Sequence, residues 1–144
     1  PATVRDLAAA DPAITVTGTV DDVRPHLERA ALLVVPLRAG GGTRIKIFEA
    51  AAAGVPVLST TVGAEGLPTL DGVHLRIADR PEDFARVAAA LLANPAEAER
   101  LARAGRELVE SRFGWDAVAD RFAELLHAGA ARARAGRLRP REPR

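Results

Sequence analysis

The stretch GGGTRIKIFEAAAAGVPVLST, from Gly40 to Thr60, limits the possible folds of this chain more than any other. It predicts a glycine-rich loop, then a short helix over Thr43–Ala53, then a buried strand over Val55–Leu58. Gly54 and Pro56 are typical of the end of a helix. Glycine lets the backbone approach a ligand closely, and a helix N-terminus attracts anions. The stretch therefore predicts an anion site.

Charged and polar residues in this stretch indicate what kind of anion it binds. Arg44 and Lys46 would lie in the first helical turn, where the helix dipole disfavours positive charge, so an anion is expected beside them. Thr43 is the expected N-cap. Glu49 follows about one turn later, and a carboxylate can accept hydrogen bonds from two vicinal hydroxyls at once. These residue types fit a nucleotide diphosphate and its ribose.

Helix and strand patterns alternate along the rest of the chain. Further strands are expected over Ile14–Val16, Leu32–Val35 and Val73–Ile77, and helices over Thr3–Ala10, Val23–Ala30, Glu82–Ala93, Ala96–Ser111 and Trp115–Ala131, with a loop over Val62–Asp71. Continuous apolar strands belong to parallel sheets that helices cover on both faces. The order predicts an α/β fold, a Rossmann-like parallel sheet that ends in C-terminal helices. The loops at 17–22, 37–42 and 59–66 should form one site, because they follow strands.

Taken in order, the motifs resemble a known family. The run RIKIFEAAAAGVPVLSTTVGAEGL resembles the donor-binding segment of GT-B glycosyltransferases of family 4, the retaining enzymes that use nucleotide sugars. The runs ITVTGTVDD, AALLVVPL and SRFGWDAVADRFAELL match the same family, so the resemblance covers Ala13–Leu126. It implies that residues 1–131 are most of the C-terminal donor-binding domain. The N-terminal acceptor domain and the first βαβ unit of the donor domain would lie elsewhere in a longer protein.

The resemblance also implies a function for that longer protein. It would transfer a sugar, of hexosyl type, from a nucleotide-diphosphate sugar to a saccharide or lipid-linked acceptor with retention, as in polysaccharide biosynthesis, and the isolated chain would be inactive. Glu49 would bind the donor ribose, and Gly41, Gly42 and Thr43 would offer backbone N–H groups to the diphosphate or the sugar. Arg44 and Lys46 would neutralise phosphate charge. No residue of the chain is assigned a catalytic role.

One position departs from the family pattern. The family often has a second glutamate eight positions before Glu49, where this chain has Gly41. Glu65 is a candidate substitute on a loop of the same edge, and a capping or solvated role is its alternative. Two other functions therefore stay open: a non-catalytic nucleotide-binding or interaction module derived from a GT-B domain, and a GT-B sugar-nucleotide epimerase.

Composition argues against several other kinds of site. The chain has no cysteine, which excludes disulfides and zinc–thiolate sites, and none of its three histidines has the spacing of a metal-ligand pair. Ser59 and Thr60 have no adjacent base of the kind a hydrolase needs. We expect no cofactor and no metal, with the nucleotide sugar acting as donor substrate. No apolar run is long enough to span a membrane, and a cytoplasmic location is expected.

The C-terminal segment has its own composition. Residues 132–144 hold six of the 20 basic residues of the chain, with one acid, Glu142. We expect a disordered basic tail, whose alternative role is contact with anionic lipid at the inner face of the membrane. Nucleic acid is not an expected partner, because the tail has no aromatic residue for stacking. By the family resemblance the single tryptophan, Trp115, would pack the last helix across the domain, either in the core or at an interface.

Overall fold

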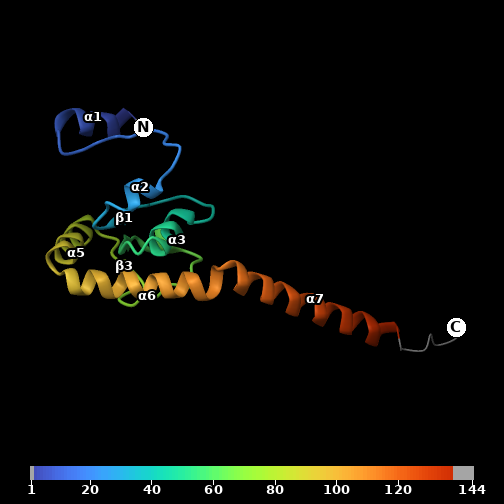
Figure 1. Ribbon diagram of the computed structural model, residues 1–144. Helices are drawn as coiled ribbons and strands as arrows, with labels where there is room; N and C mark the ends of the chain where they lie inside the picture. The colour runs from blue at the N-terminus through green and yellow to red at the C-terminus, as the bar shows by residue number, and fades with distance from the viewer. Residues whose placement is uncertain (1, 138–144) are drawn as a thin grey trace.

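The computed structural model describes residues 2–137 and contains a parallel sheet with helices around it (Figure 1). In chain order the elements are α1 (Ala2–Ala10), α2 (Arg24–Leu27), β1 (Leu33–Val35), α3 (Ile45–Ala52), β2 (Val57–Ser59), α4 (Thr61–Ala64), β3 (Arg76–Ile77), α5 (Pro81–Ala93), α6 (Pro95–Phe113) and α7 (Trp115–Arg137). The three strands are parallel in the order β1-β2-β3, with Leu33 opposite Val57 and Ser59 opposite Ile77. The predicted parallel α/β fold is confirmed.

The central strand β2 connects two hydrophobic clusters. Val57 packs in a cluster with Ile47 and Ala50 of α3, whereas Leu58 packs with Val87 and other residues of α5 and α6. Neighbouring side chains of a strand point to opposite faces of a sheet, so α3 and α5 cover opposite faces. This arrangement explains why the strand reads as a continuous apolar run, since both faces are buried. Helix α6 contacts both α3 and α5 and runs below them in Figure 1.

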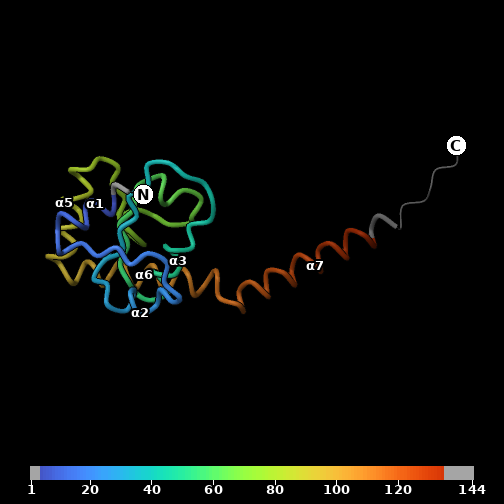
Figure 2. Tube along the Cα trace, turned by 90° about the horizontal axis from the view of Figure 1, so that it is seen from above, coloured from blue at the N-terminus to red at the C-terminus, as the bar shows by residue number. Residues whose placement is uncertain are grey.

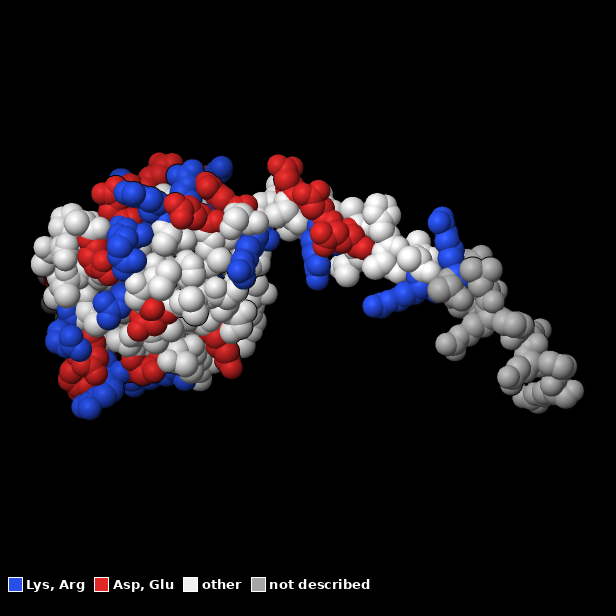
Figure 3. Space-filling model, turned by 90° about the horizontal axis from the view of Figure 1, so that it is seen from below, with Lys and Arg blue, Asp and Glu red and all other residues white. Residues whose placement is uncertain are grey.

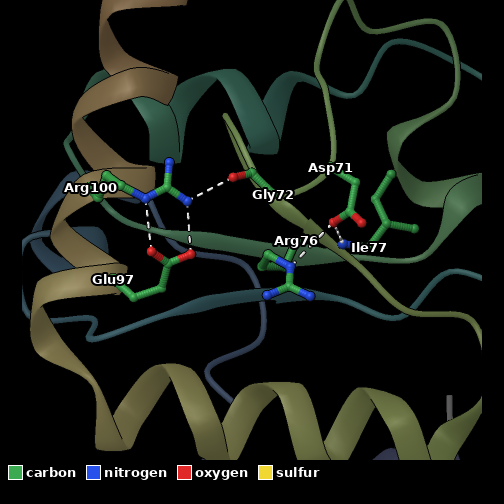
Figure 4. A network of polar contacts seen from close by, with 6 residues as sticks. All are labelled: Asp71, Gly72, Arg76, Ile77, Glu97 and Arg100. Atoms are coloured by element: carbon green, nitrogen blue, oxygen red, sulfur yellow. Dashed lines mark hydrogen bonds and ion pairs between the residues drawn. The ribbon is translucent and has the colours of Figure 1, made fainter.

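The loop that precedes β3 is tied to α6 by polar contacts (Figure 4). Arg100 of α6 donates two hydrogen bonds of 2.8 Å to the Glu97 carboxylate and one of 2.7 Å to the Gly72 carbonyl. The Asp71 carboxylate accepts from the Ile77 main-chain N–H at 2.8 Å. Hydrogen bonding to Arg100 lowers the pKa of Glu97 below its ordinary value. The contacts hold β3, the short edge strand, in register.

Some predicted elements differ from those found. Residues 14–16 are not a strand, because no described strand lies beside them and the side chains of Ile14 and Val16 are exposed. The helix expected over Val23–Ala30 is the single turn α2, and the loop expected over Val62–Asp71 begins with the turn α4. The N-cap of α3 is Arg44, not Thr43, so that helix begins two residues later than predicted.

The last helix projects away from the body of the molecule (Figure 2). Trp115 is 89% exposed, so the prediction that it packs in the core of this domain is wrong, while packing at an interface stays a prediction. The apolar side chains Val118, Phe122 and Leu125 on the same helix are exposed as well. Acidic side chains lie over the first part of α7 and basic ones toward its far end (Figure 3). None of the helices described here combines the length and apolar character needed to cross a membrane.

The basic segment differs in part from its prediction. Helix α7 continues to Arg137, six residues beyond the expected end at Ala131. Alanine and arginine are among the best helix formers, and they make up all but one of residues 130–137, so local propensity carries the helix onward. Residues 132–137 are therefore described as helix, where the sequence predicts a disordered tail. Residues 138–144, the rest of the predicted tail, lie outside the described residues.

The exposure of Trp115 leads to a first prediction. Replacing Trp115 with alanine in this chain should change the free energy of unfolding by no more than about 0.5 kcal/mol, because the indole buries almost no surface. Denaturant unfolding followed by far-UV circular dichroism measures this. Leu101, which is 0% exposed in α6, is the matched control, and its replacement by alanine should cost about 2–5 kcal/mol. Equal losses for the two variants would show that Trp115 packs.

Candidate functional site

The loops that leave β1, β2 and β3 are joined at one edge of the sheet. The Thr60 hydroxyl donates to the Leu37 carbonyl of the loop after β1. The Asp79 carboxylate, after β3, accepts from the Thr61 main-chain N–H at 2.8 Å and from its hydroxyl at 2.7 Å. These two hydrogen bonds lower the pKa of Asp79 below its ordinary value. The edge is therefore a connected surface, and the predicted loops 37–42 and 59–66 lie together on it.

The glycine loop has the conformation for which its glycines are needed. Gly40 has φ of 141° and Gly42 has φ of 92°, in a region that side-chain-bearing residues rarely adopt. A Cβ added at Gly40, Gly41 or Gly42 would meet no protein atom within 4 Å. Gly40 and Gly42 are thus needed for backbone conformation, and the space in front of the loop is open.

Arg44 does not lie where the sequence predicts it. The residue is only 6% exposed, and it is the N-cap of α3 rather than part of the first helical turn. Its guanidinium donates to the carbonyls of Gly40 at 3.0 Å, Gly41 at 3.1 Å and Val62 at 2.8 Å. The expected direct contact with phosphate does not fit this geometry, because the terminal nitrogens already donate to main-chain carbonyls.

Lys46 and Thr43 have different surroundings from Arg44. Lys46 is exposed in the first turn of α3, and among the described residues no acceptor lies within hydrogen-bond distance of its ammonium group. A cation in that turn is unfavourable next to the helix dipole, so the prediction that Lys46 meets an anion stays open. Thr43 is exposed and makes no capping hydrogen bond. Its contribution would come from its main-chain N–H group.

Glu49 lies on the exposed side of α3, in an open groove of about 710 Å³. The groove is bounded by Asp21, Asp22 and α2 on one side and by Arg106 of α6 on another. Asp22 accepts from the Arg24 side chain at 3.0 Å, which lowers its pKa. The structure thus brings Glu49 together with the predicted loop 17–22, but the glycine loop does not line this groove.

A second hollow, of about 470 Å³, lies beside the glycine loop. Gly42, Thr43 and Arg44 line it together with Glu65 and the segment that follows. Glu65, the acid named as a substitute for the missing glutamate at 41, is therefore placed where a group bound by the loop would meet it. Glu65 is also the exposed C-cap residue of α4, so the capping or solvated alternative stays open beside the substitute role.

An aromatic pair in the same hollow was missed by sequence reasoning. The rings of Phe48 and Phe113 lie with centroids 4.6 Å apart, and both side chains line the hollow. The two residues are far apart in the sequence, in α3 and at the end of α6, so no local pattern could pair them. Within the part of the chain that the structure describes, no cluster of three metal-ligating side chains is found.

Residues 1–94 match the family model described as glycosyl transferases group 1, and this span includes the glycine loop, Glu49 and Glu65. The chain belongs to this family. The predicted GT-B glycosyltransferase relationship is thereby confirmed at the level of the family, whereas the roles of the individual residues remain predictions.

Curated relatives of this group 1 chain come from Mycobacterium tuberculosis. A glycogen synthase is 33% identical over 114 residues, which cover 72% of this chain and 27% of that protein. A GDP-mannose-dependent alpha-(1-6)-phosphatidylinositol monomannoside mannosyltransferase is 33% identical over 131 residues, which cover 78% of this chain and 32% of that protein. The chain spans about a third or less of the length of these relatives.

Two solved structures superpose on this chain and support its α/β fold. A sucrose-phosphate synthase from Thermosynechococcus elongatus superposes with a TM-score of 0.75 at 24% identity over 90% of this chain and 34% of that chain. The C-terminal domain of a glycosyl transferase group 1 family protein from Francisella tularensis superposes with a TM-score of 0.65 at 20% identity, over 79% and 60%. The fold is that of a GT-B C-terminal domain.

Proposed function

We propose that this chain is the donor-binding part of a retaining family 4 glycosyltransferase, which transfers a sugar from a nucleotide-diphosphate sugar to a saccharide or lipid-linked acceptor. The observation that carries the proposal is the family match over residues 1–94, which spans the glycine loop and Glu49 together. Both relatives from Mycobacterium tuberculosis are named for building saccharides or glycolipids, and one is named as dependent on GDP-mannose. Their names support a nucleotide-sugar donor here.

The two hollows suggest how a donor lies on the domain. The groove at Glu49 would take the ribose, whose vicinal hydroxyls donate to the carboxylate. The diphosphate would face the main-chain N–H groups of Gly41 and Gly42, with Lys46 adding positive charge. The sugar would extend toward Glu65 in the second hollow. No metal or other cofactor enters this scheme, and we place the reaction on the cytoplasmic side.

The acceptor would approach from the remainder of the protein. A retaining transfer of this kind needs the donor phosphates and the acceptor hydroxyl held together in a cleft, and effective orientation supplies much of the rate. Residues 1–144 would contribute one side of such a cleft. We therefore assign transfer to the whole protein, and at most nucleotide binding to this chain alone.

A transfer assay tests the proposal. The whole protein is incubated with radiolabelled UDP- and GDP-sugars and with saccharide or lipid acceptors, and the anomeric configuration of the product is read by proton NMR. We expect transfer from one donor class, with the configuration of the donor kept. Residues 1–144 alone, the control, should bind the nucleotide without transferring sugar.

Other outcomes would favour the alternatives. Nucleotide binding without transfer to any acceptor points to a non-catalytic module, and conversion of the nucleotide sugar itself points to an epimerase. If the protein neither binds a nucleotide nor transfers a sugar, the proposed donor site is wrong.

A further inference from the structure

Arg44 holds together the two loops that border the second hollow. Its side chain leaves the start of α3 and reaches the carbonyls of Gly40 and Gly41 in the loop after β1, and that of Val62 after β2. All its hydrogen-bond partners among the described residues are main-chain carbonyls, and its buried Nε has none. A buried cation is costly unless its surroundings compensate it, so this arrangement calls for a reason beyond packing.

The contacts of Arg44 determine where the neighbouring amide groups point. The described peptide bonds are all trans, and in a trans peptide the C=O and the N–H point in opposite directions. The peptide group that carries the Gly40 carbonyl also carries the Gly41 N–H, and the Gly41 carbonyl is paired in the same way with the Gly42 N–H. Because both carbonyls face the buried guanidinium, both N–H groups face away from it.

The two amide groups are free to bind a ligand. Among the described residues, no acceptor is found for the N–H of Gly41 or of Gly42. A Cβ at either position would meet only open space, so no protein atom blocks the approach. Oriented main-chain N–H groups in such loops bind anionic oxygens, and the buried positive charge behind them adds to the attraction.

We propose that Arg44 is a positioning residue that turns the amides of Gly41 and Gly42 outward, so that they bind the diphosphate of the donor. This inference rests on the proposed donor site and deepens it. Arg44 does not touch the phosphate itself, which reverses the role the sequence suggests for it. Three acceptors in two loops suit a planar guanidinium, whereas the ammonium group of lysine is a point charge on a flexible stem.

Three variants of the whole protein separate position from charge. Arg44→Lys keeps the charge but has its donors on a single nitrogen, which cannot reproduce the contacts that two guanidinium nitrogens make in two loops. Arg44→Gln removes the charge, and Arg112→Gln removes an exposed charge at the end of α6 as a control. Calorimetry measures the affinity for UDP and GDP and, separately, for uridine and guanosine. Both Arg44 variants should lose affinity for the nucleoside diphosphate by about tenfold, or about 1.4 kcal/mol. Nucleoside affinity, and all affinities of Arg112→Gln, should stay nearly unchanged.

The outcomes discriminate a positioning role from a structural one. A purely structural role would lower nucleoside and nucleoside diphosphate affinity by the same factor, and that result overturns the inference. It is also overturned if Arg44→Lys binds the diphosphate as tightly as the wild type, because charge alone would then be sufficient.

A measurement on the wild-type protein does not depend on the folding of any variant. With glycine labelled by 15N, the amide signals of Gly41 and Gly42 should shift on addition of inorganic pyrophosphate or of the bound nucleoside diphosphate. Unchanged signals overturn the inference. If the signals shift but the protein transfers no sugar, the inference about the two amide groups is supported and the proposed transferase activity is rejected.

Discussion

Replacing Gly63 with alanine is expected to destabilise the fold by about 1–3 kcal/mol or more, as overpacking of a buried site does. A Cβ at this position would lie 2.3 Å from the Ser59 hydroxyl oxygen and 2.9 Å from the Val35 carbonyl oxygen. Ser59 is fully buried, and the Val35 carbonyl belongs to the sheet, where it accepts from the Thr60 N–H at 3.2 Å. Neither neighbour can yield without disturbing the edge that supports the glycine loop.

Thermal unfolding measures this effect. A loss of that size should lower the melting temperature by roughly 5 °C or more in a chain of this length. The control is Gly129→Ala in α7, where a Cβ meets no atom within 4 Å. Because alanine is the better helix former there, the control should be neutral or slightly stabilising. Equal melting temperatures for Gly63→Ala and the wild type would mean that α4 moves freely away from β2.

The sequence predicts the elements whose neighbours are present in the chain. Val57 and Leu58 read as part of a buried strand, and the structure confirms this because β1 and β3 lie beside β2 while α3 and α5 cover its two faces. The run Ile14-Thr15-Val16 has β-branched residues and an alternating pattern, but no described strand pairs with it, so the pattern alone does not produce a strand. An alternating pattern of apolar residues shows that a segment can form a strand, but the strand forms only where a neighbouring strand pairs with it.

The same reasoning explains Trp115 and the last helix. An apolar stripe at helical spacing predicts a covered face, and Trp115, Phe122 and Leu125 form such a stripe. In the described structure no element lies against it, so these side chains stay exposed. Periodicity shows which face of a helix is apolar, whereas contact with a partner element depends on tertiary structure.

Arg44 illustrates a limit of local charge arguments. Its place near a helix N-terminus suggests a phosphate ligand, because the dipole disfavours a cation there. That argument treats the side chain as pointing outward. The acceptors that turn it inward are carbonyls of Gly40, Gly41 and Val62, and the last of these lies 18 residues away in the sequence. The pattern of side-chain types along a sequence does not predict hydrogen bonds to main-chain carbonyls that are distant in that sequence.

Glu49→Gln is expected to weaken binding of the donor nucleotide by about tenfold in the whole protein. Hydrogen bonds to a charged group contribute about 1.5–3 kcal/mol, against about 0.5–1.5 kcal/mol for neutral pairs, and a difference near 1.4 kcal/mol is tenfold in affinity. Glu49 is exposed, with no hydrogen-bond partner among the described residues, so the fold should be unaffected. Calorimetry with UDP and GDP measures the affinity. Glu99→Gln, at another exposed acid, is the control.

A double-mutant cycle assigns the effect of Glu49 to the ribose. The second change is made in the ligand, by using the 2′,3′-dideoxy form of the nucleoside diphosphate, which lacks both hydroxyls. If the Glu49 carboxylate accepts from these hydroxyls, the wild type should lose affinity for the dideoxy form, and Glu49→Gln should lose much less. If both proteins lose the same factor, the two changes are independent and the ribose lies elsewhere. If the wild type and Glu49→Gln bind the normal nucleotide equally well, the ribose-binding role of Glu49 is likewise rejected. A coupling of about 1 kcal/mol or more would place the ribose in the groove between α2 and α3, next to the loop that carries Asp21 and Asp22.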